Sequence, residues 1–421
     1  MTTLSSDCRP RQPRPFPIPL SHRGAAGGAI ARPIVRAVVR RVPIRLRFPD
    51  GSHVGGGTST SPTLEVVRPR ALFRRLEQHP KIGLGEAYMA GDWRAAPGTD
   101  LAEALTPFAA SLATVVPRPL IALRAVVDRR PPRAHRNTRT GAKANIEAHY
   151  DLSNNLFETF LDPSMTYSSA LFEEGIPFAE QDLERAQERK IDAVLDEAHV
   201  GPGSRLLEIG TGWGALALRA ARRGARVLTV TLSQEQAALA RARIADAGLA
   251  DQVEVRIQDY RDVVGTFDAI VSVEMIEAVG EEFWPEYLQA LDRLLAPEGQ
   301  VVLQAILMDH HRYLRTRHSF GWIQKYIFPG GLIPSRQALE EVAAQDTHLH
   351  VEQTRSFGAH YAETLRRWRT DFVAQAEQVH HLGFDETFRR MWEYYLAYSE
   401  AGFASGYLDV AHLRLSRGAV R

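Results

Sequence analysis

The chain of 421 residues is long enough for two or three domains, and its 44% hydrophobic and 24% charged residues are typical of a globular protein. Its net charge of +1 indicates no particular partner, and its single cysteine, Cys8, excludes a disulfide framework and a cysteine metal site. No run of about 18 apolar residues occurs, so the sequence predicts no membrane-spanning helix.

Residues 1–43 form a basic arm that we expect to be partly disordered. Ten arginines but only one acid, Asp7, precede Pro49, and arms of this kind meet the phosphates of nucleic acid or lipid. Within the arm, Ile30–Val42 is predicted to be a helix with one apolar and one basic face. The apolar positions are Ile30, Ile34, Val38 and Val42, and the basic ones are Arg32, Arg36 and Arg40. Two interpretations stay open: the helix lies on an anionic bilayer, or it packs on its own domain.

Residues 44–127 are predicted to form a small α+β domain. Its expected elements are strands at 43–48 and 64–67, helices at 69–78 and 100–112, and a glycine-punctuated connection over Ile82–Trp93. Residues 128–144 are rich in proline and basic residues, so we expect a linker whose charge also suits phosphate headgroups.

Residues 145–421 are predicted to form the catalytic domain. The expected strands are 206–209, 227–230, 253–257, 269–273 and 301–306, and the expected helices are 155–160, 182–198, 234–247 and 281–295. Alternating strands and helices predict a mostly parallel sheet, and ligands of such sheets bind above the carboxyl ends of the strands. Gly210, Thr231, Asp259 and Glu277 all follow predicted strands.

The first of these strands runs into the turn Gly210-Thr-Gly-Trp-Gly214, which is typical of a nucleotide-binding site. A nicotinamide site would need G-x-G-x-x-G and an acid after the second strand. Here the spacing is G-x-G-x-G, and the acid, Asp259, follows the third strand. This arrangement resembles the S-adenosylmethionine methyltransferase fold, although the turn alone leaves a dinucleotide site or a purely structural turn open.

Five further stretches carry a more specific resemblance. They are His149–Phe157, Met165–Ser169, Gln258–Asp262, Val273–Gly280 and Trp322–Gly330. Together they closely resemble cyclopropane-fatty-acyl-phospholipid synthases and mycolic acid methyltransferases, over about residues 44–417. The stretches VEMIEAVG and YLAYSEAGFASGYLDV resemble most closely the actinobacterial branch that makes 10-methylene and 10-methyl (tuberculostearic) chains. The resemblance implies an α/β, Rossmann-like methyltransferase fold with a smaller N-terminal α+β domain.

The resemblance also implies residues for binding S-adenosylmethionine. They are Tyr167 and Ser168 at the methionine part, Gly210 and Gly212 at the turn, Thr231, Leu232 and Gln236 near the ribose, and Gln258 with Asp259 at the adenine. Structural alternatives stay open, because Thr231 and Ser233 are also good caps for a helix starting at Gln234, and Tyr167 is also a good core residue.

In the resembled family a bicarbonate ion acts as the base. Glu277, Ile306 and Tyr361 match its ligands, whereas Ser169 replaces the usual cysteine and Gln304 the usual histidine. Serine and glutamine still donate hydrogen bonds to an anion, but neither titrates near neutrality. Bicarbonate binding therefore stays an open expectation, and Glu277 is the expected base without it.

We thus expect a methyltransferase that acts on the cis double bond of an unsaturated phospholipid acyl chain through a carbocation. Aromatic faces can stabilise such a cation, and the candidates are Trp322, Tyr326, Phe328, Tyr361, Tyr394, Tyr395 and Phe403. A 10-methylene product, completed by a separate reductase, is favoured over a cyclopropane. The expected location is cytoplasmic, peripheral at an anionic membrane surface. A homodimer is compatible with the sequence, which does not fix the oligomeric state.

Two rival functions stay open. One is a methyltransferase of small molecules or nucleic acid, although no RNA-reading module accompanies the arm, so we expect no nucleic-acid partner. The other is a lipid-binding relative without catalysis, suggested by Ser169 and Gln304. No metal is expected, because the adjacent His310 and His311 cannot face one site together.

Overall fold

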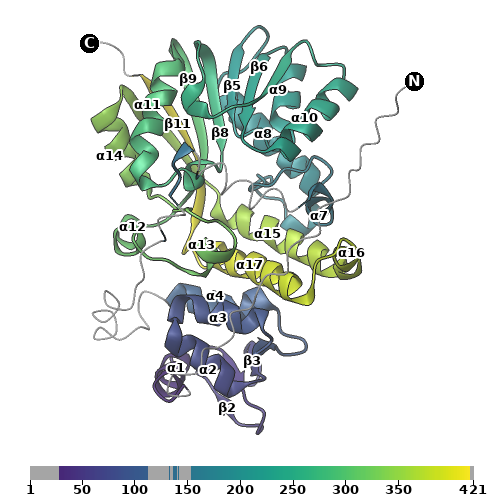
Figure 1. Ribbon diagram of the computed structural model, residues 1–421, viewed down its shortest axis with the longest axis vertical. Helices are drawn as coiled ribbons and strands as arrows, with labels where there is room; N and C mark the ends of the chain where they lie inside the picture. The colour runs from purple at the N-terminus through teal and green to yellow at the C-terminus, as the bar shows by residue number, and fades with distance from the viewer. Residues whose placement is uncertain (1–27, 112–131, 133–135, 140, 142–152, 418–421) are drawn as a thin grey trace, which may run out of the picture.

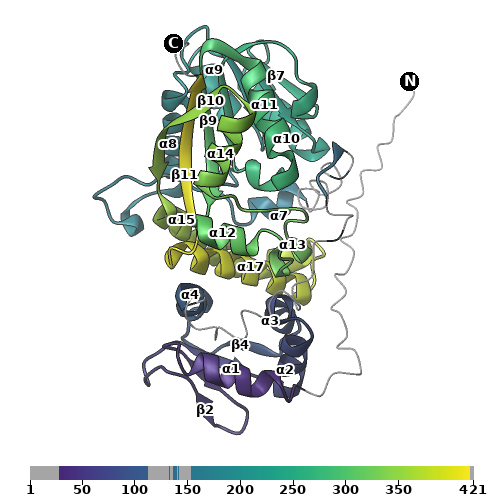
Figure 2. The ribbon, with the colours of Figure 1, turned by 90° about the vertical axis from the view of Figure 1, so that its left-hand side faces the viewer.

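The computed structural model describes residues 28–111, 132, 136–139, 141 and 153–417. The predicted disorder before Gly28 and most of the predicted linker lie outside these residues. Figures 1 and 2 show three tiers: the N-terminal domain, a middle layer that contains helices α15 (Gly358–Ala374) and α17 (Glu386–Ala404), and the large sheet with its helices. Among the described helices, none combines the length and the hydropathy that crossing a bilayer requires.

The N-terminal domain is a four-stranded sheet in the order β2-β1-β3-β4, packed with helices. Its strands are β1 (Arg45–Arg47), β2 (His53–Val54), β3 (Thr63–Val66) and β4 (Trp93–Ala95), and its helices are α1 (Ala31–Val39), α2 (Pro69–Gln78), α3 (Pro80–Met89) and α4 (Leu101–Ser111). β1 pairs with β3 in parallel, while the β1–β2 and β3–β4 pairs are antiparallel. This arrangement confirms the predicted α+β architecture of the smaller domain.

The predicted helix of the basic arm is α1, which starts one residue later and ends three residues earlier than predicted. Ala31 and Val39 are buried in the core of the domain, and Val35 and Val38 pack against it. The buried stripe therefore differs from the predicted apolar face, of which only Val38 and Val42 belong to this packing. Ile30 remains 63% exposed, and Arg32 and Arg40 point to solvent. The helix therefore packs on its own domain and still presents arginines.

The prediction of a connection over Ile82–Trp93 is wrong, because most of this segment is helix α3. Gly83 and Gly85 of this segment both lie where another backbone or ring comes close. A Cβ on Gly83 would lie 2.3 Å from the carbonyl oxygen of Arg75, and one on Gly85 would lie 2.5 Å from the ring of Trp322. Tertiary packing thus outweighs the low helix propensity of glycine.

The large sheet has seven strands in the order β10-β11-β9-β8-β5-β6-β7. They are β5 (Arg205–Ile209), β6 (Arg226–Thr231), β7 (Val253–Ile257), β8 (Phe267–Val273), β9 (Leu295–Leu307), β10 (Leu349–Ser356) and β11 (Asp409–Arg417). The five predicted strands are β5 to β9, and they are parallel. β10 and β11 were not predicted, and β11 runs antiparallel to both of its neighbours.

Helices cover both faces of this sheet, as the predicted fold class requires (Figure 1). One face packs against α8 (Leu183–Glu197), α9 (Ala215–Arg222) and α10 (Gln234–Asp246), and the other against α11 (Trp284–Leu294) and α14 (Arg336–Asp346). Side chains of each strand alternate between the two cores, as for Ala269 and Ile270 of β8. The Rossmann-like methyltransferase fold is thus confirmed.

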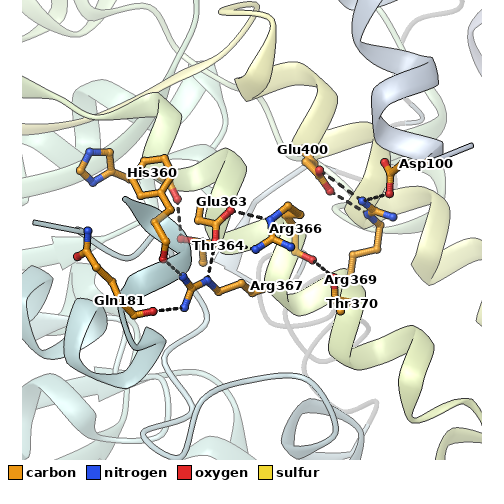
Figure 3. Close-up of polar contacts among 11 residues, drawn as sticks. Asp100, Gln181, His360, Glu363, Thr364, Arg366, Arg367, Arg369, Thr370 and Glu400 are labelled. Carbon is orange, nitrogen blue, oxygen red and sulfur yellow. Dashed lines mark hydrogen bonds and ion pairs between the residues drawn. The ribbon is translucent and has the colours of Figure 1, made fainter. Parts of the chain in front are cut away.

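The middle layer joins the two domains. It includes α7 (Asn154–Glu158), α13 (Trp322–Tyr326), α15, α16 (Ala376–His381) and α17, with α12 (His310–Thr316) nearby. One hydrophobic core runs from the N-terminal sheet through α15 and α17. Figure 3 shows an ion pair across this junction, where Arg369 of α15 bonds Glu400 of α17 and Asp100 at the start of α4, each at 2.8 Å.

Candidate active site

A cavity lies above the carboxyl ends of β5, β6, β7 and β8, where the sequence places its ligand. All nine residues predicted to bind the cofactor line it: Tyr167, Ser168, Gly210, Gly212, Thr231, Leu232, Gln236, Gln258 and Asp259. They come from the ends of the three strands β5, β6 and β7 and from the segment that precedes α8. The parallel register of the sheet therefore gathers positions that are up to 92 residues apart in the sequence, from 167 to 259.

The glycine turn forms the floor of the cavity. Gly210, Gly212 and Gly214 have φ values of 101°, 50° and 90°, which residues other than glycine rarely adopt. A Cβ on Gly212 would meet no atom within 4 Å, so the backbone at this residue is open. Helix α9 starts directly afterwards without a side-chain cap, which leaves its first amides available. The turn can therefore bring backbone N–H groups against a bound molecule.

The structure separates the roles of Thr231 and Ser233. Ser233 caps α10, because its hydroxyl accepts the amide of Gln236 at 3.2 Å. Thr231 lies in the cavity wall and donates to the side-chain oxygen of Gln236 at 2.9 Å. The alternative role as the cap of this helix therefore applies to Ser233 and not to Thr231.

Asp259 is held as an anion at the far side of the cavity. Burial acts to raise its pKa, but hydrogen bonds from Arg261 at 2.8 and 2.7 Å keep that pKa below the usual range. Gln258, next to it, donates to the carbonyl of Asp262 at 2.8 Å. The Asp259 carboxylate is therefore a fixed acceptor.

Three ionisable side chains in the cavity wall were missed by the sequence analysis: Lys190, Glu208 and Glu274. The ammonium of Lys190 donates to Ser168 Oγ at 2.6 Å, and burial lowers its pKa to about 8 against the attraction of nearby carboxylates. Burial raises the pKa of Glu208 to about 8, and its Oε2 has no hydrogen-bond partner among the described residues. Glu208 lies one residue before the end of β5, and the fold turns it toward the cavity.

Asn137 was also missed, because it lies in the predicted linker. Its side chain lines the cavity and donates to the carbonyl of Gly330 at 3.0 Å.

The five predicted catalytic residues fall into two groups. Ser169, Gln304 and Tyr361 all donate to the carboxylate of Glu274: the Ser169 amide and Gln304 Nε2 reach Oε1 at 2.8 Å, and the Tyr361 hydroxyl reaches Oε2 at 2.5 Å. Glu274 lies in the stretch Val273–Gly280 that carries the resemblance, but the resemblance points to Glu277 and not to Glu274.

Glu277 and Ile306 form the second group. Oε1 of Glu277 accepts the amide of Ile306 at 2.5 Å, and its Oε2 is buried without a partner among the described residues. Burial, helped by the negative charge of Glu274, raises the pKa of Glu277 to about 8. Glu274 and Glu277 are thus two partly buried carboxyl groups close in the sequence, of which Glu274 lines the cavity.

Two of the aromatic residues predicted to stabilise the cation, and the histidine pair considered as a metal site, have other contacts. Trp322 and Tyr394 pack edge to face at 4.8 Å, and Tyr394 also meets Tyr88 of the N-terminal domain, so these rings belong to the domain junction. His310 bonds Ser335 at 2.8 Å. Across the described part of the chain, no three His, Cys, Asp or Glu side chains gather as metal ligands.

Comparisons with known proteins agree with this geometry. Residues 137–413, more than half of the chain, match the family described as mycolic acid cyclopropane synthetase. The chain is 50% identical to the tuberculostearic acid methyltransferase UfaA1 of Mycobacterium tuberculosis over 410 residues. This alignment covers 97% of this chain and 95% of that protein. It is 33% identical over 366 residues to the cyclopropane-fatty-acyl-phospholipid synthase of Escherichia coli, covering 84% and 87%. The solved structure of mycolic acid cyclopropane synthase CmaA1 complexed with SAH and CTAB matches with a TM-score of 0.60 and 31% identity, over 65% of this chain and 98% of that one.

Proposed function

The chain belongs to the mycolic acid cyclopropane synthetase family, and we propose that it methylates the cis double bond of an unsaturated acyl chain in a phospholipid. This membership confirms the resemblance predicted from the motifs, and the protein is an S-adenosylmethionine-dependent methyltransferase. The observation that carries the proposal is that the nine predicted cofactor residues line the same cavity as the Glu274 carboxylate.

The cavity fits S-adenosylmethionine. The open backbone at Gly212 suits a close approach, and the partnerless Oε2 of Glu208 offers an acceptor to a cationic group. Tyr167 and Ser168 would hold the methionine part, Thr231 and Gln236 the ribose, and Asp259 the adenine. When bound, this donor supplies a methyl group on a positively charged sulfur.

An isolated alkene is a weak nucleophile, so the chain must act mainly by positioning the double bond in a dry site. Attack on the methyl group places a positive charge on the neighbouring carbon of the lipid. The rings of Tyr361 and Phe403 are tilted by 32° to each other with their centroids 4.4 Å apart, and the Tyr361 hydroxyl donates to Glu274 at 2.5 Å. We assign this ring pair to the stabilisation of the cation, because an aromatic face attracts positive charge without bonding to it.

The reaction ends when a base removes one proton. Loss of a proton from the new methyl group closes a cyclopropane, whereas a hydride shift followed by loss from the methyl carbon leaves a methylene branch. The name of the relative that is 50% identical, tuberculostearic acid methyltransferase, favours the 10-methylene branch here. A separate reductase would then saturate it to a 10-methyl chain.

The N-terminal domain would bring the enzyme to its lipid. Exposed Arg32 and Arg40 on α1 suit contact with an anionic membrane surface, and the adjacent Ile30 is also exposed. This contact supports a peripheral location at the inner face of the membrane.

Mass spectrometry of lipids from a host that expresses the chain tests the proposal. We expect oleoyl phospholipids to gain one CH2 unit, located at the former double bond, with an exomethylene signature. A ring at that position would identify a cyclopropane synthase instead. Unchanged lipids, with methyl transfer to a small molecule or to RNA, would refute the proposal.

A further inference from the structure

We propose that Glu274 is the base of this reaction, so that the chain supplies its own carboxylate and needs no bicarbonate ion. This inference rests on the proposed function, and it assigns to a residue the step that otherwise requires an anion from solution.

The hydrogen bonds of Glu274 are those of a bound anion. Its two oxygens receive a backbone amide from Ser169, an amide NH2 from Gln304 and a hydroxyl from Tyr361, at 2.8, 2.8 and 2.5 Å. Gln304 stands at a position where the sequence departs from the expected bicarbonate ligands, and Tyr361 matches one of them. Ser169 donates through its backbone amide, while its hydroxyl donates to the carbonyl of Ala170 at 3.1 Å. The carboxylate therefore occupies the donors that a soluble anion would need.

The donor set is itself oriented. Gln304 Oε1 lies 3.1 Å from His412 Nε2, and Nδ1 of this buried histidine lies 3.0 Å from Glu197. With the amide oxygen engaged by His412, the NH2 group of Gln304 points to Glu274. The orientation leaves Gln304 a donor, which favours an ionised carboxylate opposite it.

The backbone at Glu274 is strained. Its φ is 50°, a left-handed value that costs residues other than glycine about 1 kcal/mol to adopt. The turn after β8 thus holds a carboxylate at a position where glycine would fit more easily. Such strain at the wall of a reactive cavity indicates that the side chain has a task there.

The neighbouring carboxyl group supports the same assignment. Two close carboxylates repel each other, so the pair favours one proton. Oε2 of Glu277 has no donor among the described residues, whereas Glu274 has three, so the proton is held best by Glu277. Burial raises the pKa of Glu274 above its usual range, and the hydrogen bonds from Tyr361, Ser169 and Gln304 oppose that shift.

The step balances without a further reactant. The alkene electron pair forms the new C–CH3 bond, and the C–S electron pair stays on sulfur, which becomes a neutral thioether. A C–H bond of the cation then breaks, its electrons form the methylene double bond or the ring, and its proton moves to Glu274. The protonated side chain returns the proton to solvent before the next turnover.

The test uses the purified full chain, vesicles of oleoyl phospholipid and labelled S-adenosylmethionine, with bicarbonate either removed by degassing or added. We expect the wild type to be insensitive to bicarbonate. Glu274→Gln keeps the shape and should lower kcat by roughly a thousandfold, while the dissociation constant of S-adenosylhomocysteine changes by less than about threefold. Glu352→Gln, on β10 far from the cavity, is the matched control.

Glu274→Gly distinguishes a base from a merely structural residue. Glycine accepts the left-handed backbone, so the variant should fold, and added formate or bicarbonate should restore part of its activity. A wild type that loses activity without bicarbonate, or a Glu274→Gln variant within about tenfold of the wild type, would overturn the inference alone. A wild type that methylates no unsaturated lipid would refute the proposed function, and this inference with it.

Discussion

Replacing Arg369 with methionine should destabilise the protein more than any exposed arginine would. Arg369 and Glu400 are only 8% and 9% exposed, and Arg369 also holds Asp100 of the N-terminal domain (Figure 3). Burial acts to raise the pKa of Glu400, and its hydrogen bonds to Arg369 oppose that shift. Arg369→Met keeps most of the buried stem but leaves Glu400 as an unpaired buried charge.

The loss can be sized from these contacts. Removing one partner of a buried ion pair costs about 3 to 5 kcal/mol, and the Asp100 contact adds little because that side chain is 36% exposed. We therefore expect the free energy of unfolding in urea to fall by about 3 kcal/mol. Arg366→Met is the matched control, since its side chain is 47% exposed and pairs with Glu363 three residues away, and it should cost less than about 1 kcal/mol.

A double variant checks the cause. Adding Glu400→Gln to Arg369→Met removes the orphaned charge and should recover more than half of the loss. If Arg369→Met costs no more than Arg366→Met, or if the double variant recovers nothing, the ion pair does not join the two domains as reasoned.

Three further predictions concern the cavity and the surface. Gly212→Ala should weaken binding of S-adenosylhomocysteine by at least about tenfold in calorimetry, because the methyl group enters the open turn. Gly248→Ala is the control, since Gly248 also has a positive φ of 69° and open space but lies elsewhere. Equal losses of binding in both variants would contradict the assignment. Burial raises the pKa of Glu277 from 4.5 to about 8 in the folded protein, so its contribution to stability is lost as pH rises between these values. The free energy of unfolding of the wild type should therefore fall from about pH 5 to about pH 8, and this fall should be smaller by on the order of 2 kcal/mol in Glu277→Gln. An equal fall in both proteins would show that Glu277 is not the buried acid. Replacing Arg32 and Arg40 with glutamine should weaken sedimentation with anionic vesicles about tenfold at low salt and hardly at all with neutral ones, and equal sedimentation of both forms would remove α1 from the membrane contact.

Much of the catalytic domain could be predicted from the sequence because each parallel strand is a short apolar run between turns. β10 and β11 escaped, since β10 is half exposed and polar along much of its length, and nothing local marks β11 as the partner of β9. Helix α3 escaped for a different reason. Its glycines report a close approach of Arg75 and Trp322, and that contact exists only in the folded chain.

The candidate site divides in the same way. Seven of the nine predicted cofactor residues lie at or after the ends of the strands β5, β6 and β7, and Tyr167 and Ser168 precede α8, so the motifs that carry the family resemblance were enough to predict them. The choice between Glu274 and Glu277 could not be made from spacing, because three residues and one left-handed backbone angle decide which carboxyl group reaches the cavity. Ser169 and Gln304 depart from the expected bicarbonate ligands, and their common contact with Glu274 is visible only in the folded chain.

The place of β11 in the sheet has a consequence for how the chain folds. This strand lies between β9 and β10, and its Asp409 pairs with Leu307, about a hundred residues earlier. Closing so long a loop is slow, so we expect β10 and β11 to pair with the sheet late, after the five parallel strands have formed. Until then β10 has no neighbour, and Gln304 lacks the histidine that aims it. Catalytic competence is thus acquired in one of the last folding events.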